Sequence, residues 1–147
     1  MKKVKSLLGL MLSLCLVGSS IFIVHATPSF VPDTETRGWM GGWDEIEGFF
    51  MNESTMLRSS TPDSHFGQRQ DLVINGTTNW RSHGVTDWSG MFHYTTARMV
   101  RTQLFGADIV VECSGRQWGT NRTTATSPWV PFNPNVSSPS ARTFWGN

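Results

Sequence analysis

The chain has 147 residues, with 12 Lys and Arg against 11 Asp and Glu, and 38% of its residues are hydrophobic. These values favour one globular domain with a modest core, and the near-neutral charge argues against a strongly basic nucleic-acid-binding surface. Of the two cysteines, Cys15 lies in an apolar N-terminal segment. If that segment is removed on export, Cys113 has no partner for an internal disulfide, which excludes a disulfide-stapled scaffold. Pairing of Cys113 between two molecules stays open.

Residues 1–26 have the three parts of a secretory signal peptide. The cationic segment MKKVK comes first, residues 7–24 are almost wholly apolar, and Val24 and Ala26 stand three and one positions before a cut after Ala26. We expect cleavage there and a secreted, extracellular product of a Gram-positive-type bacterium. An uncleaved membrane anchor is the alternative, but Ser and Gly near the end of the apolar run favour removal.

After cleavage, 121 residues (147 − 26) would remain, with nine arginines, eleven carboxylates and no lysine. Residues 27–80 contain eight acids and three arginines, and residues 81–147 contain three acids and six arginines. The two halves thus carry opposite net charges of −5 and +3. Such polarity helps two halves of a domain to pack, or steers a partner.

The start of the exported chain predicts a leader followed by a helix. Residues 27–43 contain prolines and glycines without periodicity, which is typical of a flexible leader. Asp44 and Glu47 have the spacing of a capping box, and apolar residues follow at helical spacing. We expect a short helix over residues 44–57. Its polar face is acidic, which favours packing on the domain over binding to a membrane.

Strand signals dominate from residue 71 onward. The β-rich segment 72–74 ends at Asn75-Gly76, a strong turn pair, and residues 77–80 would return. Residues 81–90 read as a loop with at most one short strand.

The clearest element is a hairpin that joins residues 92–105 to residues 109–113. Further strands are expected over residues 123–130 and 141–145, and the segment 141–147 should dock as an edge strand. Short strands separated by frequent turns predict an all-β domain over residues 44–147, a small antiparallel sandwich or barrel.

Candidate chemistry is sparse, and we assign no catalytic residue and expect no cofactor. His83, Asp87 and His93 form the one conceivable metal set, since catalytic zinc takes three protein ligands. No HExxH or paired CxxC motif supports it, so surface or hydrogen-bonded histidines explain the pattern equally well. Cys113 lies in an apolar alternating segment, where a thiol is inert.

Seven tryptophans are the main compositional anomaly. Exposed Trp side chains suit stacking on sugar rings or burial at a partner interface. A small domain without disulfides also needs large apolar side chains, so we expect four or five buried indoles and two or three exposed ones. Trp39 and Trp43 are the best exposed candidates, and Trp88 and His93 complete the predicted binding set.

The layout from Trp88 to Asn147 resembles the secreted bacteriocins similar to lactococcin 972. The shared features are a signal peptide, a β-rich body without disulfides, the stretch Phe92-His93-Tyr94 and the aromatic end Phe144-Trp145. The resemblance implies an antibacterial role against neighbouring cells or their envelope precursors, and carries over no functional residue.

Three function classes follow. The first is a non-enzymatic protein that binds a cell-envelope component or target-cell surface, with a bacteriocin-like role. The second is a carbohydrate- or wall-binding module, and the third is a metal-assisted secreted enzyme. No nucleic-acid partner is expected, and self-association stays open.

Overall fold

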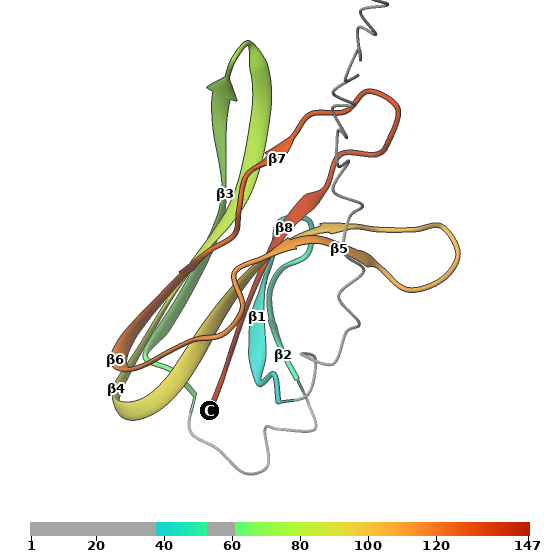
Figure 1. Cartoon of the computed structure of the whole chain (residues 1–147). Helices are drawn as coiled ribbons and strands as arrows, with labels where there is room; N and C mark the ends of the chain where they lie inside the picture. The colour runs from blue at the N-terminus through green and yellow to red at the C-terminus, as the bar shows by residue number, and fades with distance from the viewer. Residues whose placement is uncertain (1–37, 53–60) are drawn as a thin grey trace, which may run out of the picture.

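The computed structural model describes residues 38–52 and 61–147, and within these ranges every regular element is a β-strand (Figure 1). The predicted all-β class is confirmed, because one antiparallel sheet curls into a half-barrel. The predicted signal peptide and its cleavage site lie outside the described residues. Within the described ranges no helix is long and apolar enough to cross a membrane.

The long strand β4 is the hub of the sheet. The path through the sheet is β2-β1-β8-β4-β3, and β5, β6 and β7 also pair with β4, all in antiparallel fashion. The strands are β1 (Gly41–Asp44), β2 (Gly48–Met51), β3 (Ser64–Ile74), β4 (Thr77–Arg101), β5 (Ile109–Cys113), β6 (Gln117–Thr126), β7 (Val130–Pro131) and β8 (Ser140–Gly146).

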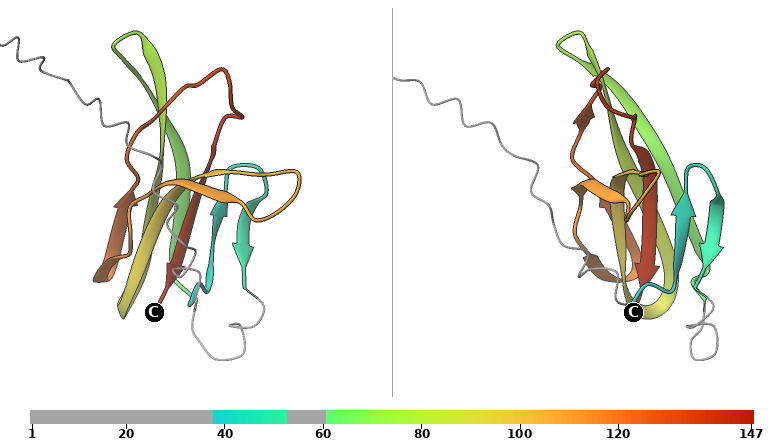
Figure 2. Two further views of the ribbon diagram at one scale, coloured as in Figure 1. Left: turned by 45° about the vertical axis from the view of Figure 1, so that its right-hand side comes forward. Right: turned by 90° about the vertical axis from the view of Figure 1, so that its right-hand side faces the viewer.

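β4 and β6 bend together, and this bend folds the sheet over on itself (Figure 2). Their register runs from His83 to Trp88, shifts, and resumes at Phe92. Gly90 and Asn121 both have positive φ at the bend, and Gly90 N donates to Asn121 Oδ1 at 2.8 Å. A local irregularity of this kind is how a strand passes from one layer of a sandwich to the other.

The bend defines two layers. The first layer contains β3, β7, residues 77–88 of β4 and residues 121–126 of β6. The second layer contains β1, β2, β5, β8, residues 92–101 of β4 and residues 117–120 of β6. Ser82 Oγ of the first layer donates to the carbonyl of Arg142 in the second at 2.8 Å, which shows how closely the layers approach.

The interior has a polar middle between two apolar clusters. One cluster, near the bend, consists of Met40, Trp88 and Trp145, and the other consists of Met99, Val130 and Ala141. Buried hydroxyl side chains lie between the layers: Ser82, Thr86, Thr95, Thr123 and Thr143. The core is therefore held by hydrogen bonds as well as by apolar contact, because buried hydroxyls need partners.

The predicted helix over residues 44–57 is wrong. Residues 44–52 form the end of β1, a turn and β2, while residues 53–57 lie outside the described residues. β1 pairs with β2 on one side and with β8 on the other, and these ladders override the helical spacing. The leader boundary needs the same correction, because Gly41 to Trp43 belong to β1.

Two further expectations are corrected. Residues 81–90 are part of β4 and do not form a loop. Up to Trp88, buried residues, most of them small, face the interior and alternate with half-buried residues that face outward. The segment 141–147 does not form an edge strand, since β8 lies between β1 and β4. The turn at Asn75-Gly76 is confirmed, with φ of 50° and 77°.

Candidate binding site

An exposed aromatic group lies on the outer surface of the second layer, close to the bend. Phe92 is 60% exposed and Trp118 is 47% exposed. Their rings stack with centroids 5.3 Å apart and an interplanar angle of 12°. Trp118 also makes an edge contact with Tyr94, at 4.8 Å between centroids. We call Phe92, Tyr94 and Trp118 the aromatic platform.

The strands explain why these three rings meet. Tyr94 and Trp118 are direct partners across the β4–β6 ladder, and Phe92 is two residues before Tyr94, hence on the same side. Tyr94 is itself buried and donates its hydroxyl to the carbonyl of Gly38 at 2.9 Å. The Arg116 guanidinium lies 4.6 Å from the centre of the Tyr94 ring. The exposed pair is thus seated on a fixed base.

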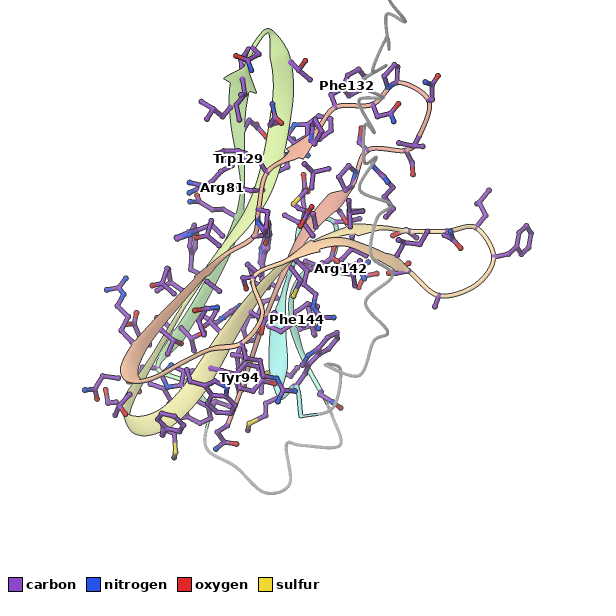
Figure 3. The ribbon with its side chains drawn as sticks, in the orientation of Figure 1. Arg81, Tyr94, Trp129, Phe132, Arg142 and Phe144 are labelled. Atoms are coloured by element: carbon purple, nitrogen blue, oxygen red, sulfur yellow. The ribbon has the colours of Figure 1, made fainter. Side chains whose placement is uncertain are left out.

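A second aromatic group continues along the same surface. Trp39 stacks on Phe144 with centroids 3.7 Å apart, and Phe50 meets Phe144 edge to face at 5.9 Å. The Arg98 guanidinium lies 5.0 Å from the Trp39 ring centre. Figure 3 shows Tyr94 and Phe144 in the same lower part of the molecule, near the C-terminus. Trp39 and Phe50 are half-buried and Phe144 is buried, so these rings offer less exposed surface than Phe92 and Trp118.

The structure disperses the predicted binding set of Trp39, Trp43, Trp88 and His93. Trp88 and His93 are buried and contact each other at 5.7 Å between rings, so they offer no surface to a ligand. Trp43 packs against the apolar cluster around Met99. Trp39 is half-buried on the second aromatic group. Of the seven tryptophans, only Trp118 belongs to the exposed class, fewer than expected.

The alternative metal set of His83, Asp87 and His93 is not brought together either. His83 Nδ1 lies 2.9 Å from Thr126 Oγ1, and Asp87 pairs with Arg122 at 3.5 Å on the outside of the first layer. His93 points into the core, where Nδ1 lies 2.9 Å from the carbonyl of Met91. No group of three or more His, Cys, Asp or Glu side chains suited to a metal occurs within residues 38–52 and 61–147.

Cys113 is half-buried at the end of β5, and its sulfur accepts a hydrogen bond from Gly115 N at 3.3 Å.

Sequence reasoning did not single out Trp118 or Phe92 as binding residues. Trp118 stands alone in the polar run Gln117–Thr126, and a large ring in an otherwise polar strand was the available signal. Comparison of the chain with protein-family models, with curated proteins and with solved structures found no match.

Proposed function

We propose that this chain is a secreted binding protein that recognises a carbohydrate of the cell envelope through Phe92 and Trp118. The exposed stacked pair on its buried Tyr94 base carries this proposal. Two large apolar rings held in one place on the surface are costly unless they contact a partner. Their fixed orientation reduces the conformational entropy that a ligand would have to overcome on binding.

The neighbourhood of the platform favours a sugar over a purely apolar ligand. Thr120 follows Trp118 by two residues on β6 and pairs with Phe92, so it lies on the same side of the sheet, and it is exposed. Pyranose rings present an apolar C–H face and a polar edge, so they suit an aromatic surface beside a hydroxyl group and the Arg116 guanidinium. Aromatic rings with a few convergent polar groups are typical of specific small-ligand sites.

Binding, rather than catalysis, is proposed because of the chemistry of the platform itself. Its members are three rings beside the Arg116 guanidinium, which supply contact area and hydrogen-bond donors. The platform contains no carboxylate, imidazole or thiol, the groups that most often carry acid–base or nucleophilic catalysis.

Retention on insoluble peptidoglycan tests the proposal. The protein should sediment with the polymer, and Trp118→Ala or Phe92→Ala should lower the retained fraction severalfold. Phe66→Ala is the matched control, because Phe66 is also an exposed aromatic residue but lies on β3, away from the platform. Equal retention of Trp118→Ala and Phe66→Ala would contradict the proposal.

An antibacterial, bacteriocin-like role is the second candidate. The two segments on which the resemblance rests are neighbours in the sheet, since Tyr94 pairs with Gly146 and Thr95 with Trp145. An envelope glycan or its precursor would serve as the target for both proposals. Growth inhibition of neighbouring Gram-positive cells by the purified protein, lost in Trp118→Ala, would support it. Absence of inhibition at saturating protein would reject the antibacterial role and leave glycan binding unaffected.

A further inference from the structure

Three loops at the end of the molecule away from the bend carry exposed apolar side chains. Leu104 and Phe105, in the loop between β4 and β5, are 96% and 93% exposed. The β3–β4 hairpin tip and the β7–β8 loop add four more exposed residues. We call the whole set the apolar rim: Val73, Ile74, Leu104, Phe105, Phe132 and Val136.

Specific contacts tie the β7–β8 loop to the β3–β4 hairpin and to the base of the β4–β5 loop. Phe132 N donates to the carbonyl of Thr78 at 2.8 Å, and the Phe132 ring meets Trp80 edge to face, which ties the β7–β8 loop to the β3–β4 hairpin. Arg101 Nε donates to the carbonyl of Ser137 at 2.9 Å, which ties the same loop to the base of the β4–β5 loop. Figures 1 and 2 show all three loops away from the C-terminus.

The charges of the rim are uneven. Asp71 lies 3.0 Å from Arg69, which also pairs with Glu45, and Asp108 lies 2.5 Å from Arg142, which also pairs with Asp44, so each of these arginines is shared by two carboxylates. Arg81 contacts Gln70 Oε1 and the Trp129 ring, and Arg101 donates to a carbonyl, so neither pairs with a carboxylate of residues 38–52 or 61–147. Figure 3 shows Arg81 beside Trp129, close to Phe132. Two positive charges and half-buried indoles therefore stand behind the apolar tips.

We propose that the apolar rim attaches the protein to the surface of a phospholipid bilayer that contains anionic headgroups. The loop tips would enter the boundary between headgroups and acyl chains, where apolar area drives binding. Arg81 and Arg101 would lie at the level of the phosphates, and Trp80 and Trp129 at the depth that indoles prefer.

A bilayer fits this rim better than a second protein. Leu104 and Phe105 project from the body on a separate loop (Figure 1), almost fully exposed, and form a convex tip instead of a flat patch. Stable protein interfaces bury about 800 Å² per partner with close shape complementarity, which separate protruding tips do not provide. A fluid bilayer adapts to a convex apolar tip without a matching shape.

This inference goes beyond glycan recognition and does not depend on it. The aromatic platform lies near the bend of β4, whereas the rim lies at the opposite end of the first layer and on the β4–β5 loop. Loss of one activity by substitution therefore leaves the other measurable. A protein with both surfaces would contact the wall polymer and the membrane surface through different parts of the sheet.

Co-sedimentation with lipid vesicles tests the inference. Vesicles of phosphatidylcholine alone and of phosphatidylcholine with phosphatidylglycerol are mixed with the full chain and with its variants. The double variant Leu104→Ser/Phe105→Ser should bind anionic vesicles at least about tenfold more weakly, because it removes two large apolar side chains from the bilayer. Arg101→Gln should weaken binding to anionic vesicles and leave binding to neutral vesicles unchanged.

The matched control is Phe92→Ser/Trp118→Ser, which also replaces two exposed aromatic residues but leaves the rim intact. It should bind vesicles as the unmodified chain does. All variants share the same N-terminal segment, so a difference between them reports on the rim. Equal vesicle binding by the rim variant, or no vesicle binding by any form, would overturn the inference. So would a dimer that the rim substitutions dissociate, since the rim would then be a contact between copies.

Discussion

His65 Nδ1 lies 2.9 Å from Thr86 Oγ1, and this contact joins β3 to a chain of buried hydroxyls between the layers. Thr86 Oγ1 lies 2.6 Å from Thr95 Oγ1, which lies 2.6 Å from Thr123 Oγ1. On the other side of the ring, His65 Nε2 lies 2.8 Å from Thr143 Oγ1. A neutral imidazole fits this environment, because one nitrogen accepts and the other donates.

The half-buried ring of His65 makes the stability of the fold depend on pH. Burial lowers the pKa of His65 from 6.5 to about 4. Between these values the unfolded chain binds a proton at this site and the folded chain does not, so the free energy of unfolding falls as pH drops from 6.5 toward 4. The full effect is on the order of 3 kcal/mol. Urea unfolding at pH 7.5, 5.5 and 4.5 measures it.

Substitution of His65 separates this effect from other titrations. His65→Gln should lower stability at pH 7.5, because it disturbs the hydroxyl network, and should flatten the decline between pH 6.5 and 4. His83→Gln is the control: burial and the nearby Arg81 charge also lower the pKa of His83, but its ring is more exposed. A pH slope that survives His65→Gln unchanged would show that another group controls it.

The ion pair between Asp44 and Arg142 should contribute more to stability than the surface pairs. Asp44 is only 3% exposed, accepts from Arg142 Nε, and also accepts from the backbone N of Ile46 at 2.7 Å. Asp44→Ala would leave a partly buried guanidinium without this partner, and we expect a loss of about 3 kcal/mol in the free energy of unfolding. Chemical denaturation at pH 7 measures the loss.

Asp71→Ala provides the comparison for Asp44→Ala. Asp71 also pairs with an arginine, Arg69, but both side chains are substantially exposed. Exposed pairs contribute less than about 1 kcal/mol, so this variant should unfold almost as the unmodified chain does. Similar losses for the two variants would mean that burial of the Asp44 pair has no special weight.

The same Asp44 shows how far sequence reasoning reached. Its carboxylate does accept from the backbone N of residues two and three positions later, Ile46 and Glu47, as the capping pattern predicted. The cap closes a turn between two strands instead of opening a helix, and Gly48 follows with φ of 83°. The sequence therefore predicted the local hydrogen bonds of Asp44 correctly. It did not predict that a strand forms here instead of a helix, because the strand depends on pairing with β8, about 100 residues away.

The surface proposed here for binding agrees with the sequence prediction only in residue type. Aromatic residues were expected to form it, and the exposed pair is aromatic, but the residues differ from those predicted. Trp88 and Phe92 are four residues apart, yet one is buried and the other exposed, because the bend at Gly90 shifts the register between them. The alternation of side chains along a strand no longer predicts which ones are buried where the strand passes from one layer to the other.

Gly67 should not tolerate a side chain. It lies on β3 opposite Gly84, and a Cβ atom there would stand 2.5 Å from Trp43 Cε3 and 2.6 Å from Thr143 Oγ1. Gly67→Ala should therefore cost about 1–3 kcal/mol in the free energy of unfolding, because the two layers would have to separate. Gln68→Ala, the neighbouring change on the outer side, should alter stability by less than about 0.5 kcal/mol. Equal melting temperatures would mean that the layers do not meet at Gly67.

Removal of residues 141–147 should prevent folding, since β8 connects two parts of the sheet. Its loss would leave β1 paired with β2 alone and open one side of β4 from Tyr94 to Met99. It would also remove Trp145, which is fully buried against Trp88 at 5.5 Å between rings. Near-UV circular dichroism should lose its folded signal, whereas deletion of the exposed Asn147 alone should preserve it. A truncated chain with an unchanged cooperative melt would place β8 outside the structural core.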